Sequence, residues 1–499
     1  MLESAFLMRY LDLGVVAAYL VGITWFGARF RRSQRTLRDY FLGGRKAPWW
    51  AISLSIVSAE TSTLTIIGTP PLAFTGNLGF LQVVFGYLLA RVVISLVFLP
   101  HYFRGEMYTA YELMERRFGR RIRKLTAGTF LVIRALAEGV RVFAISIVIS
   151  IVLGMGEVAS IAVILCLTLF YTFEGGMTAV IWTDVVQMFL YVFGALVSFF
   201  VILQHIPGGW PTVLAVAAPA GKFALFDFRF ALSAEFFSRT YTFWAGLIGG
   251  CFLTTASHGT EQLMVQRLLA ARTRGESRGA LLASWVVIFL QFSLFLLVGV
   301  ILFVYHAQAG LAPPKPLDRL YPGFVWQHLP RGLAGLVVAA ILAAAMSNLS
   351  AALNSLASTS IMDFLKPLAA RKAAPKEDAW WLRRARGATV VWGAVLFGIG
   401  TLARHWGPVL EAGLSIASIA YGGLLGVFLL GILTRQVGEK AAMAGMVAGF
   451  AVMIYVAVIH RQFYTPIAWT WYVLIGTTVT FLTGCAGALV ERRQAGGGK

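Results

Sequence analysis

The sequence predicts an all-α integral membrane protein, and three observations carry this prediction. Of the 499 residues, 58% are hydrophobic and only 13% are charged, a balance that soluble globular domains do not show. Apolar runs of membrane-spanning length recur along the whole chain. The lysines and arginines gather in alternate connections between these runs, as the positive-inside rule requires of a multi-span protein. We therefore expect one integral domain and no soluble module.

Hydropathy divides the chain into about thirteen candidate spans. Their expected ranges are 10–28, 47–75, 79–101, 125–154, 157–173, 179–204, 241–265, 279–305, 332–362, 385–403, 409–433, 441–459 and 467–489. The connections on one side, with the C-terminal tail, hold 30 of the 42 lysines and arginines. This asymmetry predicts an outside N-terminus and a cytoplasmic C-terminus. The net charge of +20 is thus a topology signal that favours contact with the lipid bilayer, and no nucleic-acid partner is expected.

Several signals are negative. The start of the chain has no basic region ahead of an apolar core, so no cleaved signal is expected. Three cysteines lie in apolar runs without paired spacing, which predicts packing residues: Cys166, Cys251 and Cys485. The chain has no phosphate-binding glycine loop, paired metal-ligand histidines or nucleophile elbow, so no enzyme is expected. The long external loop 205–240 is either an outer gate or a plain surface loop.

The second candidate span interrupts itself. Between two apolar stretches lie hydroxyl-bearing residues from Ser58 to Thr65, followed by the consecutive prolines Pro70 and Pro71. Each proline removes a backbone donor and clashes with the carbonyl four residues earlier, so the pair predicts a broken helix. In hydrocarbon such a break persists only where it lines a cavity or binds something. Freed carbonyls beside hydroxyls suit a small hard cation, and broken helices near the midplane are the binding elements of secondary transporters.

The ninth candidate span carries a stripe of oxygen-bearing side chains. Ser347, Ser350 and Asn354 recur at helical spacing on a helix that is otherwise made of small residues. Close packing, with hydroxyls bonded to their own helix, would explain the serines. It does not explain Asn348 and Asn354. The stripe is therefore either a packing surface or part of a binding site.

Four motifs carry a family resemblance. They are Asp39-Tyr40-Phe41-Leu42-Gly43-Gly44-Arg45 before the second span; Gly175-Gly176, Ala179-Val180, Trp182-Thr183-Asp184 and Gln187 at the sixth; Gly259-Thr260-Glu261-Gln262 with Gln266-Arg267 in the seventh; and Ala344, Ser347 and Leu353-Asn354-Ser355 in the ninth. In order and spacing they resemble the solute:sodium symporter family, which includes sodium-coupled sugar, proline, iodide, monocarboxylate and sialic acid transporters. The resemblance runs from about residue 10 to residue 490.

This resemblance implies a leucine-transporter-like fold with two inverted five-helix repeats. The first repeat is expected at 47–204 and the second at 241–433, with peripheral C-terminal helices at 441–489. It also implies a sodium site between the broken helix and the ninth span. The ligands fall on the backbone oxygens of Ser58, Thr61 and Ala344 and on the side chains of Ser347 and Asn348.

The last of these positions departs from the family pattern. The family usually has a second hydroxyl there, and this chain has Asn348. An amide oxygen can coordinate a hard cation, but the side chain is longer and reshapes the cage. Sodium is therefore the expected coupling ion, and a proton-coupled variant stays open.

Two carboxylates fall inside the candidate spans. Asp184 stands at the family's signature aspartate, where it would draw the cation toward the cytoplasm or form a second ion site; the alternative is pairing with a nearby cation at the interface. Glu60 has no evident partner in the sequence. It departs from the sugar-transporting members of the family, which look to have an amide side chain at this position. It would neutralise the cation, bind a substrate amine or titrate, unless it is simply a buried protonated side chain.

Charged residues also mark the third and fourth spans. Arg134, Glu138 and Arg141 follow spacings of four and three, which place them on one helix face. They form either an internal ion ladder or a solute site in which Arg141, the deepest, meets a carboxylate or phosphate bidentately. Arg91 in the third span is isolated in the sequence and equally ambiguous.

The other solute-site candidates follow from loose alignment with the family. Ser257 and His258 fall where sugar-transporting relatives have aromatic gating residues, and Thr65 and Gln82 are candidates for the pocket wall. Because Ser257 is not aromatic, and because the lysine of the next span in those relatives has no counterpart, a galactose-like solute is disfavoured. A lone membrane histidine is as often a hydrogen-bonded core residue.

Together these observations predict a sodium-coupled secondary active symporter that imports a small polar organic solute by alternating access. We expect it in a bacterial-type plasma membrane, with a monomer sufficient for transport. The intramembrane arginines favour anionic solutes such as monocarboxylates, while sugars, polyols and amino acids stay open. The alternatives are a proton-coupled symporter of the same fold and a non-transporting solute sensor, although the chain shows no signalling domain.

Overall fold

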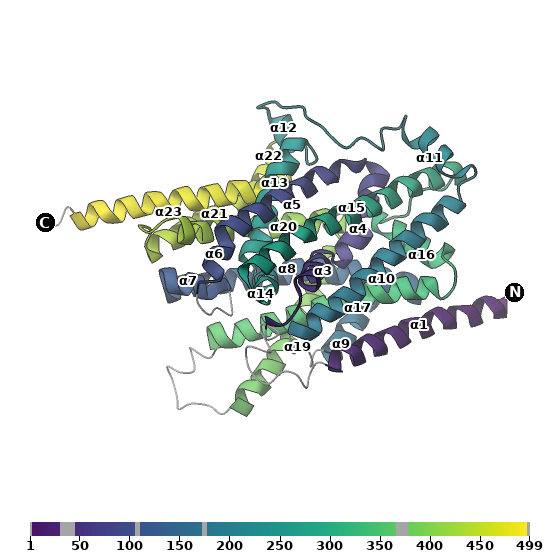
Figure 1. The fold of residues 1–499 in the computed structure, drawn as a ribbon, viewed down its shortest axis with the longest axis horizontal. Coiled ribbons are helices and arrows are strands. Elements are labelled where there is room, and N and C mark those ends of the chain that lie inside the picture. Colours follow the sequence, from purple (N-terminus) through teal and green to yellow (C-terminus); the bar gives the residue numbers. More distant parts are fainter. Residues whose placement is uncertain (1, 30–44, 105–109, 172–176, 366–377, 497–499) are drawn as a thin grey trace.

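The chain folds into a bundle of long helices. A computed structural model describes all residues except 1, 30–44, 105–109, 172–176, 366–377 and 497–499, and it contains no strand within the described part. Most of the long helices run along the long axis of the molecule, and the two ends of the chain lie at opposite ends of that axis (Figure 1). The predicted all-helical class is therefore confirmed.

Each candidate span coincides with helical segments. The segments are α1 (Leu2–Ala28), α3 (Trp49–Glu60), α4 (Thr63–Thr75), α5 (Leu81–Val93) with α6 (Leu99–Tyr102), α8 (Arg120–Leu153), α9 (Glu157–Tyr171), α10 (Met177–Gln204), α13 (Phe243–Thr260), α14 (Gln262–Leu269), α15 (Arg274–Ala309), α17 (Leu333–Thr359), α19 (Asp378–Ala403), α20 (Val409–Leu433), α21 (Glu439–Ile454) and α23 (Tyr472–Gly496). Within the described residues, seven helices are long and apolar enough to cross a membrane, and the bent pair α3–α4 is an eighth candidate.

Short helices connect these segments. They are α7 (Ala110–Phe118), α11 (Gly209–Ala217), α12 (Ala234–Ser238), η5 (Leu317–Arg319), α16 (Leu320–His328) and α22 (Arg461–Phe463). In Figure 1, α11 and α16 lie near the end of the bundle that holds the start of α1, and α7 lies toward the opposite end. The number of helices that cross the membrane stays a prediction.

Glycines let several helices approach each other closely. A Cβ atom added to Gly86 of α5 would lie 2.6 Å from the carbonyl oxygen of Gly246 in α13. A Cβ atom added to Gly299 of α15 would lie 2.1 Å from the carbonyl oxygen of Pro70 in α4. No side chain fits at either contact. Small residues at helix interfaces are how membrane helices gain packing contacts, because lipid provides no hydrophobic force between them.

The broken second span is confirmed, but the break does not lie at the prolines. α3 and α4 meet at an angle of 65° around Thr61 and Ser62, whereas Pro70 and Pro71 lie inside α4. The prolines only remove donors within a helix that continues through them. The chain breaks where hydroxyl side chains cluster, because serine and threonine offer the backbone other hydrogen-bond partners.

The two halves of the broken span meet different neighbours, which is what positions the site. α3 packs against α10 and α15, and α4 packs against α15, α20 and α8. α13 packs against α5 and α20, and α17 packs against α1, α8 and α10. α21 and α23 lie against α20 on one side of the bundle (Figure 1). The break is therefore enclosed by α8, α10, α15, α17 and α20.

Candidate functional site

The break between α3 and α4 leaves backbone and side-chain oxygens in the core. Thr61 is extended (φ −85°, ψ 91°) and its N–H donates to the carbonyl of Val57 over 2.9 Å. Its hydroxyl accepts a 2.6 Å hydrogen bond from Nε2 of Gln291 in α15. Thr61 is fully buried. The break is thus held from α15 and is not a disordered bend.

A second break, which the sequence prediction missed, faces the first. The predicted span 241–265 is two helices: α13 ends at Thr260, Glu261 is extended (φ −83°, ψ 130°), and α14 begins at Gln262. Glu261 is 9% exposed. The only sequence signal was the pair Gly259 and Thr260, both weak helix formers, directly before a glutamate in an apolar span.

A cavity of about 160 Å³ lies between the two breaks. Both broken helices contribute to its wall, together with α5, α8, α15 and α20. The acidic, basic and histidine side chains on the wall, among those the structure describes, are Glu60, Arg134, Arg141, His258 and Glu261. Aromatic side chains complete it, with Phe80, Tyr87 and Phe292 on one side. Drug-sized ligands occupy pockets of roughly 300–1,000 Å³, so this cavity suits a smaller solute.

The first charged network joins α3, α5, α13 and α15. Arg91 has no exposed surface, and its NH2 lies 2.6 Å from Oε2 of Glu60. Its Nε donates to the hydroxyl of Ser284 over 3.0 Å. Nε2 of His258 lies 3.4 Å from the same Glu60 oxygen, and its Nδ1 lies 2.8 Å from the hydroxyl of Ser257. Arg91 and Glu60 appeared isolated in the sequence, yet each is the other's partner.

The second charged network joins α8, the second break and α20. Oε1 of Glu138 is shared by NH2 of Arg134, at 2.9 Å, and by NH1 of Arg141. NH1 of Arg134 lies 2.7 Å from Oε1 of Glu261, whose Oε2 accepts a 2.6 Å hydrogen bond from the hydroxyl of Tyr421. The ladder predicted from the α8 spacing is present. It also extends to Glu261, which the sequence did not indicate.

Arg141 differs from the other charged residues of the wall. Its side chain is 28% exposed, against 10% for Glu60, 9% for Arg134 and 12% for Glu261. Its Nε is buried and, like Nε of Arg134, has no hydrogen-bond partner in the described part of the chain, so exposure is what distinguishes Arg141. Arg141 is therefore the charged group that an entering solute can reach.

A much smaller cavity, about 10 Å³, lies beside the first break. It is lined by Ser62 and Thr63 of the break, Glu138 and Arg141 of α8, and Asn348 of α17. This volume is close to the minimum of roughly 10–15 Å³ that a cavity needs to hold one water molecule. Arg141 lines both cavities, so they meet at this side chain.

The structure describes three of the five predicted sodium ligands in full and the other two only as backbone. Ser58 and Thr61 are buried at the end of α3. Asn348 faces the small cavity. Ala344 and Ser347 are placed only as backbone of α17, and their side chains lie outside the described part. In the described residues, no group of three or more His, Cys, Asp or Glu side chains could hold a metal ion.

Asp184 lies in a separate buried cluster. Its Oδ2 is 2.9 Å from NH2 of Arg267 in α14 and accepts a 2.6 Å hydrogen bond from Ser55 of α3. Nε of Arg267 also donates to Ser55 over 3.0 Å. In this conformation the carboxylate is therefore bound to an arginine, and the cluster joins α3, α10 and α14. Part of the motif before it, Gly175-Gly176, lies outside the described residues, as does most of Asp39–Arg45.

The predicted solute residues fall into two groups. Glu60, Thr65, Ser257 and His258 line the main cavity, as does Arg141, and Glu138 lines the small one. Gln82 lines neither of these two cavities in the described part of the chain, so its place in the pocket wall stays a prediction. Its amide bonds to three backbone groups elsewhere.

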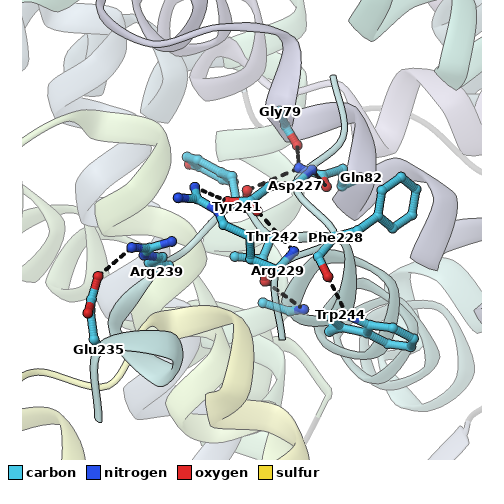
Figure 2. A network of polar contacts seen from close by, with 11 residues as sticks. Gly79, Gln82, Asp227, Phe228, Arg229, Glu235, Arg239, Tyr241, Thr242 and Trp244 are labelled. Atoms are coloured by element: carbon cyan, nitrogen blue, oxygen red, sulfur yellow. Dashed lines mark hydrogen bonds and ion pairs between the residues drawn. The ribbon is translucent and has the colours of Figure 1, made fainter. Parts of the chain in front are cut away.

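Gln82 fastens an outer strap, residues 218–241, to α5. Its Nε2 donates to the carbonyls of Gly79 and Tyr241 over 3.1 and 3.0 Å, and its Oε1 accepts the N–H of Asp227 at 2.9 Å. Figure 2 shows this amide at the centre of the strap's polar contacts, with the ion pair of Asp227 and Arg229 beside it. That arginine lowers the pKa of the Asp227 carboxyl.

The strap packs against Phe80, a residue of the main cavity wall. The ring of Tyr241 packs against Phe80 at 5.8 Å, and its hydroxyl donates to Glu411 of α20 over 2.7 Å. Phe80 lines the cavity from the inside and is 2% exposed. Lys222 donates to the carbonyls of Phe74 and Gly76 at the end of α4 over 2.7 and 3.0 Å. The strap thus holds α4, α5 and α20 together above the cavity.

Comparison with known proteins identifies the family. The model of the sodium:solute symporter family matches residues 40–449. The human sodium/iodide cotransporter is 30% identical over 477 residues, which cover 93% of this chain and 72% of the relative. The human sodium-coupled monocarboxylate transporter 1 is 30% identical over 445 residues, which cover 87% of this chain and 70% of the relative.

A solved structure of a sodium-coupled symporter has a similar fold. It is the substrate-bound, outward-open state of a Na+-coupled sialic acid symporter, with a TM-score of 0.79, 25% identity, and coverage of 96% of this chain and 98% of that one. The predicted resemblance is confirmed, as are the transporter class and the sodium ion as coupling ion. The chain belongs to the sodium:solute symporter family and is a multi-pass membrane transporter, not an enzyme, that couples solute movement to sodium.

Proposed function

We propose that this symporter imports a small carboxylate anion together with sodium. The observation that carries the proposal is the position of Arg141, which is the most exposed charged side chain on the wall of a cavity of about 160 Å³. A guanidinium presents paired donors that match the two oxygens of a carboxylate. Arg141 is paired with Glu138, as the other charges of the wall are paired within the protein, but its side chain is more exposed than theirs.

The named solutes of the relatives support an anion. They are iodide, a monocarboxylate and sialic acid, and all three are anions at neutral pH. The cavity volume favours a small member of this group. Iodide alone would leave the hydrogen-bonding groups Ser257, His258 and Thr65 on the wall without a function.

The sodium site of this proposal is the predicted one. Its ligands are the backbone oxygens of Ser58, Thr61 and Ala344 and the side chains of Ser347 and Asn348. The buried oxygens at the break and the cavity beside Asn348 support it. Asp184 receives the ion on its way to the cytoplasm once Arg267 has moved away.

The proposed architecture has thirteen spans with two inverted repeats at 47–204 and 241–433, and peripheral helices at 441–489. Two breaks, one in each repeat, support it, since α3–α4 and α13–α14 face each other across the cavity. We place the N-terminus outside and the C-terminus in the cytoplasm of a bacterial-type plasma membrane, in contact with its lipids. A monomer suffices, because the cavity lies within one chain. Transport proceeds by alternating access, with the strap and Phe80 opening on the outer side and the Asp184 cluster opening on the inner side.

Thermal unfolding of the purified protein in sodium or in choline tests this proposal, with pyruvate, acetate, iodide, galactose and proline as solutes. A ligand at 100 times its dissociation constant adds roughly 2.7 kcal/mol to stability. We expect sodium to stabilise the protein, and a carboxylate to add to this effect only in sodium. Ser347→Ala should abolish the sodium effect. The matched control is Ser160→Ala in α9, a buried serine whose hydroxyl bonds to the carbonyl of Gly156 in its own chain segment. Stabilisation by galactose or proline alone would contradict the solute class.

A further inference from the structure

Two buried oxygens beside the small cavity have no partner. Oε2 of Glu138 and Oγ1 of Thr63 accept no hydrogen bond within the described part of the chain. Glu138 has no exposed surface and Thr63 is 2% exposed. Both residues line the small cavity together with Asn348. A carboxylate, a hydroxyl and an amide around a cavity just large enough for one small particle are the ligands that a hard cation takes.

The charges around Glu138 balance without any ligand. Arg134 and Arg141 carry two positive charges, and Glu138 and Glu261 carry two negative charges, all within one contiguous network. A cation entering the small cavity alone would leave one net positive charge in the membrane interior. A carboxylate entering the main cavity alone would leave one net negative charge. Unbalanced charge is costly in a low-dielectric interior, whereas the two ions together restore neutrality.

Arg141 is placed to respond to both ions. It lines both cavities, and in this conformation one of its terminal nitrogens is bound to the Glu138 oxygen that Arg134 also holds. A cation on Glu138 competes for that carboxylate. Arg134 stays anchored by Glu261, so Arg141 is the partner that can leave.

We infer that Glu138 makes solute binding depend on sodium, an inference that rests on the proposed carboxylate symport. The sodium ion of the proposed site, held in part by Asn348, extends into the small cavity and also binds Oε2 of Glu138 and the hydroxyl of Thr63, so that one ion has all of these ligands. Arg141 then leaves Glu138 and donates to the carboxylate of the solute in the main cavity. No bond other than these ionic contacts forms or breaks. Glu138 is thus a sodium ligand on α8, and Arg141 is the switch between the two cavities.

The test compares the binding of sodium and of pyruvate to purified wild-type protein, Glu138→Gln, Arg141→Gln and the double variant. Sodium binding is read from thermal stabilisation without solute, and pyruvate binding is read by calorimetry in sodium and in choline. Glu138→Gln removes the negative charge at nearly constant volume. The matched control is Glu157→Gln in α9, which pairs with Arg319 away from both cavities. Elution as a single species checks folding, and the double variant restores the charge balance if either single variant is unstable.

The expected results differ between variants. The wild type and Glu157→Gln should bind pyruvate at least about tenfold more tightly in sodium than in choline, because the cation offsets an otherwise unbalanced charge. Glu138→Gln should lose sodium stabilisation and bind pyruvate equally in both salts. Arg141→Gln should keep sodium stabilisation and lose pyruvate binding. The double variant should show neither.

Two results separate this inference from the proposed function. If Glu138→Gln keeps both the sodium stabilisation and the sodium dependence of pyruvate binding, Glu138 is not the sodium ligand and the inference is overturned, while carboxylate symport stands. If the wild type binds no carboxylate, the proposed function fails. In that case the sodium arm still decides the role of Glu138, because it needs no solute.

Discussion

Replacing Arg91 by methionine should destabilise the protein strongly, because Glu60 at the end of α3, beside the first break, would lose its cationic partner. The arginine has no exposed surface and its guanidinium lies 2.6 Å from Glu60, whose side chain is 10% exposed. Arg91→Met keeps most of the apolar stem but leaves a buried carboxylate without its cation. Removing one partner of a buried pair costs about 3–5 kcal/mol.

This cost converts into a measurable shift. Unfolding entropy is roughly 2.1 cal/mol/K per residue, so the 499 residues give roughly 1 kcal/mol/K. We therefore expect the unfolding temperature of Arg91→Met in detergent to fall by about 3–5 °C. Adding Glu60→Gln removes the unpaired charge, and the double variant should recover at least half of the loss, since contacting residues are not additive.

An exposed pair of the same chemistry serves as the control. Arg229 and Asp227 of the outer strap also lie 2.6 Å apart, but the arginine side chain is 73% exposed. Exposed pairs contribute about 0–1 kcal/mol, so Arg229→Met should shift the unfolding temperature by no more than about 1 °C. Equal small shifts for both arginine variants would refute the reasoning, as would a double variant whose loss equals the sum of the two single losses.

Three further predictions concern packing, pH and the outer closure. Gly299→Ala should lower the yield of folded protein and its unfolding temperature, because its Cβ would lie 2.1 Å from a carbonyl of α4, whereas Gly279→Ala, with nothing within 4 Å, should not. Burial raises the pKa of the Asp318 carboxyl to about 6, so its ionisation destabilises the folded state above that pH. Asp318→Asn should therefore raise the unfolding temperature by about 3 °C at pH 8 and by little near pH 4; an equal gain at both pH values would contradict this cause. Tyr241→Phe removes the hydrogen bond to Glu411 and should speed amide hydrogen exchange in the outer strap, as measured by mass spectrometry; unchanged exchange would show that this contact does not hold the strap.

The sequence predicted the features that depend on local pattern. Hydropathy and charge placed the helices, and the motifs identified the family. The spacing of Arg134, Glu138 and Arg141 predicted their ion ladder, because side chains three and four apart share a helix face. A broken second span was also expected.

The errors and omissions concern contacts between distant segments. The prolines predicted the break of the second span too late in the chain. The break lies at Thr61, whose hydroxyl is held by Gln291 of α15. Glu60 and Arg91 appeared unpaired because their partnership joins α3 to α5. Nothing in the sequence indicated that Gln82 bonds to the backbone of Asp227 and Tyr241 and so joins α5 to the strap. No local pattern in the chain encodes these pairings, because helix packing creates them.

The second break shows the same limit. Glu261 lies in an apolar run that reads as one span, and its partners Arg134 and Tyr421 come from α8 and α20. The carbonyl of Gly259, directly before this break, accepts a hydrogen bond from the hydroxyl of Tyr102, and the buried Glu261 side chain is paired on both carboxylate oxygens. The family match reveals the symporter class, whereas the choice of solute depends on these individual side chains.

The most direct test of the account is uptake of radiolabelled pyruvate into proteoliposomes with an inward sodium gradient, with choline in place of sodium as the comparison. We expect pyruvate to accumulate above its external concentration only with the sodium gradient, and unlabelled acetate to compete with it while galactose does not. Equal pyruvate uptake in sodium and in choline, or accumulation driven by a proton gradient without sodium, would contradict the central claim that sodium and a small carboxylate are carried together.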